Sequence, residues 1–118
     1  MQQANEIQFE QHDGVMLLDI QGDITAFSEP YLNEAYQKAT QENATKMVLK
    51  FETDAYINSG GIAVLIQILA QTKKNGQLIG ITGLSEHFVK IFNMVGITKF
   101  ATIYDTVDSA LQAFATFA

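Results

Sequence analysis

The stretch Thr53–Leu69, "TDAYINSGGIAVLIQIL", decides how the rest of the chain folds. It joins a short apolar segment, "KMVLKF" at Lys46–Phe51, to a nearly unbroken apolar run that ends in a pair of lysines. That run is too long for a typical strand, and cations in a last turn followed by Gly76 are typical of a helix C-terminus. We therefore predict a strand, a loop at Asn58–Gly61 and then a helix that is buried on more than one side.

Upstream of this stretch, two strands are expected. "EIQFEQ" alternates apolar and polar residues, with Ile7 and Phe9 on one face. Asp13-Gly14 is a strong signal for a two-residue hairpin turn, because both residues tolerate a positive φ. The largely apolar "VMLLDIQGDI" that follows at Val15–Ile24 is interpreted as the returning, central strand.

A first helix should follow Ser28, which is a suitable N-cap residue. Pro30 would lie in the first turn, where the backbone amide has no partner within the helix, so the missing N–H of proline costs little. Farther along, "QLIGI" predicts a strand, Ser85 caps a helix that Gly96 ends, and "ATIY" predicts a short strand. A last helix opens at Asp105 or Thr106. The apolar stripes of these helices are Leu32, Ala35, Tyr36 and Ala39 in the first, Phe88, Ile91, Phe92 and Val95 in the third, and Val107, Ala110, Leu111 and Phe114 in the last.

The predicted element order is ββαβαβαβα. Strands that alternate with helices indicate right-handed crossovers and an α/β fold. We expect a mixed, mostly parallel sheet of about five strands with about four helices, and a chain of 118 residues is most simply one domain, 1–118.

Composition excludes several classes of function. Seven lysines, no arginine and thirteen acidic residues give a net charge of −6, which argues against binding of nucleic acid or anionic membranes. Cysteine is absent, so thiol and disulfide chemistry are excluded. No signal-peptide pattern opens the chain, and no apolar run approaches the roughly 20 residues of a membrane span, so we expect a cytoplasmic protein without direct membrane insertion.

Catalysis is not expected. His12 and His87 lack a second ligand at metal-binding spacing, and no pair of carboxylates can be set face to face from spacing alone. Ser59 lies in "NSGG" rather than in a Gly-x-Ser-x-Gly elbow, and no histidine can be assigned to it. We predict a non-enzymatic protein with no metal and no cofactor.

The loop Asn58–Gly61 stands out for another reason. Ser59 is interpreted as the N-cap of the buried helix, and Gly60 and Gly61 would let the strand-to-helix turn pack tightly. Glycine in a first helical turn weakens the helix unless a close approach of backbone or a partner surface requires it. The resulting helix N-terminus is small and smooth, and its free N–H groups favour negative charge such as a phosphate.

"YINSGGIAVL" at Tyr56–Leu65 resembles the signature of STAS domains, the fold of bacterial anti-sigma factor antagonists: an apolar pair, Asp-Ser-Ser-Gly or Asp-Ser-Thr-Gly, and a buried helix. Two other stretches are also similar to the family. They are "LDIQGDIT" at Leu18–Thr25, and the long "GQLIGITGLSEHFVKIFNMVGITKFATIYDTVDSAL", which contains the phrase Ile91–Ile97. The resemblance spans nearly the whole chain and agrees with the element order predicted from the residues.

The resemblance implies a switch that regulates transcription. In the family, a GHKL-type serine kinase that is also an anti-sigma factor phosphorylates the serine or threonine before the glycine, the unphosphorylated form binds that kinase, and a PP2C-type phosphatase reverses the switch. Carried over without a gap, Asn58 replaces the Asp, Ser59 the first Ser, and Gly60 the phosphoacceptor. Two interpretations stay open: either Ser59 accepts phosphate one position away, or the switch is lost and the protein binds its partner constitutively.

We expect the partner surface to comprise the loop Asn58–Gly61 and the helix after it. Thr25 and Ser85 are further partner-binding candidates, since both follow strands that end at the same edge of the sheet, and Met94 is a candidate as a partly exposed helix residue. An alternative function is that of a non-phosphorylated adaptor in a lipid transporter or a stress-sensing complex. A third is binding of a small anionic ligand or nucleotide at the helix N-terminus.

Overall fold

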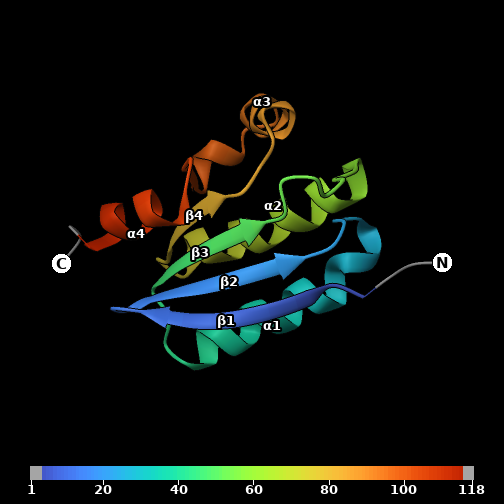
Figure 1. Cartoon of the computed structure of the whole chain (residues 1–118). Coiled ribbons are helices and arrows are strands. Elements are labelled where there is room, and N and C mark those ends of the chain that lie inside the picture. Colours follow the sequence, from blue (N-terminus) through green and yellow to red (C-terminus); the bar gives the residue numbers. More distant parts are fainter. Residues whose placement is uncertain (1–3, 116–118) are drawn as a thin grey trace.

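The structure is a computed structural model that describes residues 4–115. A five-stranded sheet carries four α-helices and two short 3-10 helices (Figure 1). The elements are β1 (Glu6–His12), β2 (Val15–Gln21), η1 (Ala26–Ser28), α1 (Glu29–Gln41), β3 (Lys46–Phe51), α2 (Ser59–Lys74), β4 (Leu78–Thr82), α3 (Glu86–Met94), η2 (Ile97–Lys99), β5 (Thr102–Ile103) and α4 (Val107–Ala115). The predicted order ββαβαβαβα is confirmed.

The strands lie side by side in chain order, β1-β2-β3-β4-β5. β1 and β2 are antiparallel, and the three other pairs are parallel, so the sheet is mixed and mostly parallel as predicted. The hairpin turn lies at Asp13 and Gly14, whose φ values of 49° and 85° are both positive. Such a pair forms a type I′ turn, whose twist matches that of the flanking strands.

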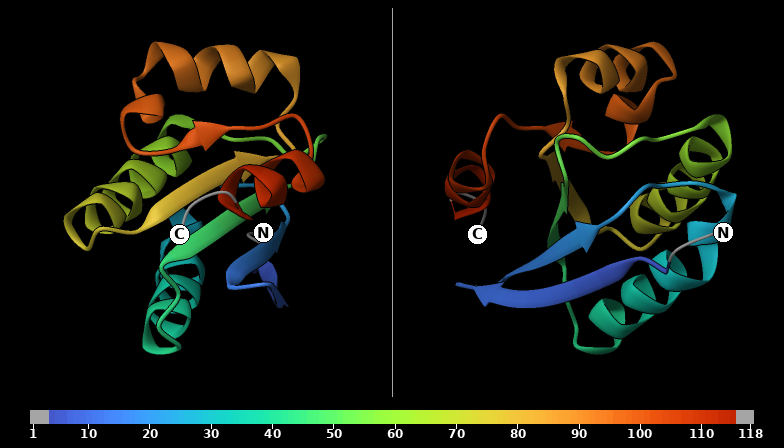
Figure 2. Two further views of the ribbon diagram at one scale, coloured as in Figure 1. Left: turned by 90° about the vertical axis from the view of Figure 1, so that its left-hand side faces the viewer. Right: turned by 45° about the vertical axis from the view of Figure 1, so that its right-hand side comes forward.

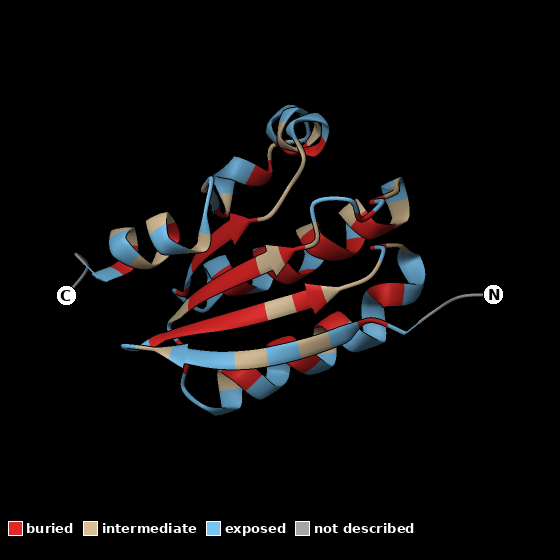
Figure 3. Ribbon diagram, in the orientation of Figure 1, coloured by how far each residue is buried: buried red, intermediate tan, exposed pale blue. Residues whose placement is uncertain are grey.

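Unequal layers cover the two faces of the sheet. α1, α2 and α3 pack on one face and form the main core with alternate residues of β2, β3 and β4, including Leu18, Leu49 and Ile81. Among the helices of residues 4–115, α4 alone packs on the other face, and it covers part of it through a small cluster around Val48 and Phe114. Figure 2 shows α4 apart from the other helices, and Figure 3 shows that the three inner strands are largely buried while β1 is mostly exposed.

Four predictions about element ends need correction. The second strand was expected to reach Ile24 but ends at Gln21, because Gly22 turns the chain with a φ of 93°. The last strand was expected at 101–104 and spans only Thr102–Ile103. Ser28 precedes α1 as predicted, yet its hydroxyl makes no cap bond to that helix and serves η1 instead. Val95 was placed in an apolar stripe, but it follows the end of α3 and is 45% exposed.

Candidate functional site

Two loops meet at the carboxyl edge of the parallel strands. The segment after β2 and the segment after β3 pair at one parallel bridge, Ile24 with Ile57. The Ile24 amide donates to the Tyr56 carbonyl at 2.9 Å, and the Asn58 amide donates to the Ile24 carbonyl at 3.1 Å. The carboxylate of Asp23 adds a bond by accepting from the Tyr56 amide at 2.9 Å. The turn that carries "NSGG" is therefore held against the segment that carries Thr25.

The N-cap of α2 is Asn58 and not Ser59, so that prediction is wrong. Asn58 has an extended backbone, with φ −98° and ψ 179°, and its side-chain oxygen accepts from the Gly61 amide at 2.9 Å. Ser59 is already the first helical residue, and its side chain is exposed. Within residues 4–115 no hydrogen bond engages its hydroxyl, so this group is available to solvent and to a partner.

The two glycines of the loop have different structural roles. A Cβ atom at Gly61 would overlap with the carbonyl oxygen of Ile24, so this position requires glycine. A Cβ atom at Gly60 would lie 3.0 Å from the Cβ atom and 3.1 Å from the backbone nitrogen of Ala26, a tight contact that a small shift of η1 can relieve. The prediction of close packing at this turn is confirmed, and η1 is the segment that packs against Gly60.

η1 presents an aromatic side chain beside this loop. Thr25 and Ser28 form a capping box: the Thr25 hydroxyl accepts from the Phe27 amide at 3.1 Å, and the Ser28 hydroxyl accepts from the Thr25 amide at 3.0 Å. The Ser28 hydroxyl also donates to the Asp23 carbonyl at 3.2 Å. With its backbone held in this way, Phe27 keeps 62% of its surface exposed.

Tyr56 is a second exposed aromatic residue at the same edge. It is 60% exposed and lies two residues before the cap of α2. Its ring makes an edge-on contact with Phe88 of α3, with 6.4 Å between ring centroids. Sequence reasoning missed both Phe27 and Tyr56, because an isolated aromatic residue in a loop carries no periodicity that separates exposed from buried.

Ser85 and Met94 lie at opposite ends of α3. The Ser85 hydroxyl accepts from the Phe88 amide at 3.3 Å, so it is the N-cap of α3 as predicted, and Phe88 links it to Tyr56. Met94 is the last residue of α3 and is 83% exposed. Nine residues at about 1.5 Å each separate the two ends by roughly 13 Å. Ser85 thus lies at the end of α3 whose Phe88 contacts Tyr56, and Met94 lies at the other end of the helix.

The described residues, 4–115, contain no group of three or more His, Cys, Asp or Glu side chains that could hold a metal ion. Over the same residues, none of the helices is both long and apolar enough to cross a bilayer.

A carboxyl-edge loop that leads into a buried helix, on a mixed sheet of this order, defines a STAS-type domain. The family model of the STAS domain matches residues 6–110, and the chain belongs to this family. It is 22% identical over 106 residues to the anti-sigma-B factor antagonist of Bacillus subtilis, covering 90% of this chain and 96% of that protein. It is 26% identical over 102 residues to the anti-sigma-F factor antagonist RsfB of Mycobacterium tuberculosis, covering 85% and 81%.

Solved structures share the fold. An anti-sigma factor antagonist from Mycobacterium paratuberculosis superposes with a TM-score of 0.78 at 22% identity, over 93% of each chain. The phosphorylated form of the Bacillus cell fate determinant SpoIIAA superposes with a TM-score of 0.63 at 12% identity, over 92% of this chain and 99% of that chain. These likenesses confirm the fold that was expected from the sequence.

Proposed function

We propose that this protein is an anti-sigma factor antagonist, which binds a GHKL-type serine kinase that acts as an anti-sigma factor. The observation that carries the proposal is the edge formed by Phe27, Tyr56 and Ser59, the exposed first residue of α2. Exposed aromatic residues around small, smooth backbone are typical of the centre of a protein–protein interface. The relatives named above, which match over most of this chain, support the class of partner.

Ser59 is the phosphorylation candidate in this proposal. Its hydroxyl is exposed and free of hydrogen bonds within the described residues, while Gly60 at the family's acceptor position has no hydroxyl to modify. A phosphate on Ser59 would add about −1.5 to −2 charges beside Phe27 and Tyr56. Binding would then weaken, because a partner surface shaped for a neutral loop would have to desolvate and accommodate that charge. A PP2C-type phosphatase would restore the binding form.

The first test is the mass of the Ser59 peptide after the protein is incubated with ATP and lysate of its host. We expect one phosphate on this peptide and none in the Ser59→Ala variant. An unmodified peptide, in a lysate whose kinase is active on other substrates, would support the alternative of a non-phosphorylated adaptor in a larger assembly.

The second test is a binding titration against the anti-sigma factor of the host. Ser59→Asp and Ser59→Glu should weaken binding by about tenfold or more, and Ser59→Ala should change it much less, because only the acidic residues place charge in the interface. Thr98→Asp is the matched control, since Thr98 is exposed and lies with Gln77 and Leu78 at the opposite edge of the sheet. Equal affinity of all Ser59 variants would rule out control by phosphorylation at this residue.

A further inference from the structure

The two borders of the sheet differ in length. β5 contributes only two residues, whereas β1 pairs with β2 over seven consecutive residues without a bulge. Within residues 4–115 no strand pairs with the outer side of β1, and Figure 2 shows it at the free border of the sheet. Proteins commonly guard a long edge strand with lysine, proline or a bulge. The sequence of β1, "EIQFEQH", has none of these, and its charged side chains are the carboxylates of Glu6 and Glu10.

The hairpin turn determines which backbone groups of β1 face outward. In a two-residue type I′ turn the flanking residues, here His12 and Val15, form a hydrogen-bonded pair. Even-numbered residues of β1 therefore direct their amides and carbonyls to β2. The odd-numbered Ile7, Phe9 and Gln11 direct theirs away from the sheet, where they can pair with another strand.

β1 is complementary to itself in one register. A two-fold axis at Phe9, the middle residue of β1, lets all seven residues pair with a second copy in antiparallel orientation. The outward amides and carbonyls then meet each other: Phe9 faces Phe9, and Ile7 faces Gln11. On the opposite face of the strand, Glu6 of each copy lies across from His12 of the other, whose Nε2 atom also lies 3.1 Å from the carboxylate of Glu10 in its own strand.

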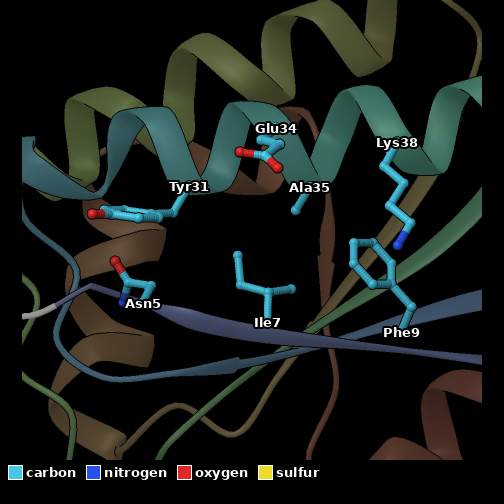
Figure 4. A pocket seen from close by; sticks show the side chains of 7 residues that line it. All are labelled: Asn5, Ile7, Phe9, Tyr31, Glu34, Ala35 and Lys38. Carbon is cyan, nitrogen blue, oxygen red and sulfur yellow. The ribbon is translucent and has the colours of Figure 1, made fainter.

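The side chains beside this border support the same register. Ile7 and Phe9 are half-buried and form the floor of an open groove under α1, which Figure 4 shows with Tyr31, Glu34 and Lys38 on its other side. Tyr31 is 39% exposed, and the Lys38 ammonium lies 4.6 Å from the centre of the Phe9 ring. A second strand along β1 would extend this apolar floor by a second Phe9 and remove both rings from water.

We propose that the chain forms a homodimer in which two β1 strands pair antiparallel about Phe9 and join the two sheets into one. The interface is a single strand pair flanked by one groove from each copy, which is small for a stable dimer, so association is reversible and depends on concentration. This proposal is independent of the function proposed above, because it uses the border of the sheet and not its carboxyl edge.

Sedimentation velocity over a range of concentrations tests the dimer on the full chain without any partner. We expect a shift from monomer to dimer as concentration rises, and loss of that shift in Gln11→Pro. Proline at position 11 removes an outward amide and no bond to β2, so the fold should tolerate it. Circular dichroism checks that this variant is folded.

A charge-swap cycle keeps the test valid even if Gln11→Pro does not fold. His12→Glu places two glutamates opposite each other, twice per dimer, and should raise the dissociation constant by about tenfold. Glu6→Lys added to it restores an opposite pair and should recover the wild-type value. Gln67→Glu, on the exposed side of α2, is the control for added charge and should have no effect. A purely monomeric wild type, a dimer that persists in folded Gln11→Pro, or a cycle without rescue would each overturn the proposal.

Discussion

Gly60 and Gly61 are neighbours in the chain, yet the structure gives them different tolerances to substitution. A methyl group at position 61 would enter the carbonyl of Ile24, which is held in the bridge to Ile57 and cannot move alone. A methyl group at position 60 would lie 3.0 Å from the Cβ atom and 3.1 Å from the backbone nitrogen of Ala26, so η1 must shift by a few tenths of an ångström to admit it. The contact at position 61 is with backbone that is held in a bridge, whereas the contact at position 60 is with η1, a helix of three residues.

We therefore predict unequal losses of stability for the two alanine substitutions. Gly61→Ala should lower the free energy of unfolding by about 2–4 kcal/mol, because the two loops must separate to admit the methyl group. Gly60→Ala should stay within about 1 kcal/mol of wild type, because the higher helix propensity of alanine offsets a tight contact. Urea denaturation measures both. Similar losses would show that the close approach at Gly61 does not decide the choice of residue.

Two residues suitable as N-caps, Asn58 and Ser59, are adjacent at the start of α2. Asparagine and serine are both good N-caps, so "NS" predicts a cap within one residue without saying which of the two provides it. In the structure the N-cap is Asn58. The pairing with Ile24 keeps the backbone extended as far as this residue, and the helix starts immediately after it. Because of this one-residue shift, the Ser59 hydroxyl does not cap α2, so the proposed phosphate on Ser59 would break no capping hydrogen bond.

At the scale of elements, η1 is the piece that sequence reasoning did not predict. Three residues are too few to show helical periodicity, and Thr25 was proposed as a partner contact and not as a cap. The structure shows that Thr25 and Ser28 cap each other's turn and so hold Phe27 at the surface. Thr25 thus positions η1, and its contact with a partner stays a prediction.

We predict that Phe27 and Tyr56 are the anchors of partner binding. Phe27→Ala and Tyr56→Ala should each weaken binding of the anti-sigma factor by about tenfold or more, because exposed aromatic residues dominate interface energies. Leu78→Ala is the control, since Leu78 is 40% exposed at the start of β4, away from the site.

Because Tyr56 touches Phe88, thermal unfolding must accompany the titration of Tyr56→Ala. Unchanged binding in both folded variants would contradict the assignment of the interface to this edge. If Met94→Ala weakened binding more than either aromatic variant, the interface would instead lie at the far end of α3.

On the scale of the whole molecule, the sheet divides two unequal cores. Three helices cover one face and share a large apolar cluster, whereas α4 covers only part of the other face with Ala110 and Phe114. Elements with few buried apolar contacts open at lower free energy than the global unfolding of the domain. α4 is such an element, and α2 lies at the other extreme because one of its faces is buried from Gly61 to Thr72.

Hydrogen exchange should therefore distinguish the two helices. Amides of α4 should exchange at least about tenfold faster than those of α2 under native conditions, and Phe114→Ala should accelerate exchange in α4 more than in α2. Mass spectrometry of peptides from residues 59–74 and 107–115 measures this. Equal protection of both helices would mean that the apolar cluster under α4 opens at as high a free energy as the main core.

The sequence by itself determined the order of elements, the mixed sheet, the hairpin turn at Asp13-Gly14 and the region of the candidate site. These features follow from local rules: apolar period, turn residues with positive φ, and glycine where a helix begins. Only the tertiary structure decided that Asn58 is the cap, that Gly61 and not Gly60 is obligatory, and that Phe27 and Tyr56 are exposed at the same edge of the sheet as Ser59. The physical reason is that each of these depends on the segment after β2 meeting the segment after β3, a contact between residues about thirty positions apart that no local pattern encodes.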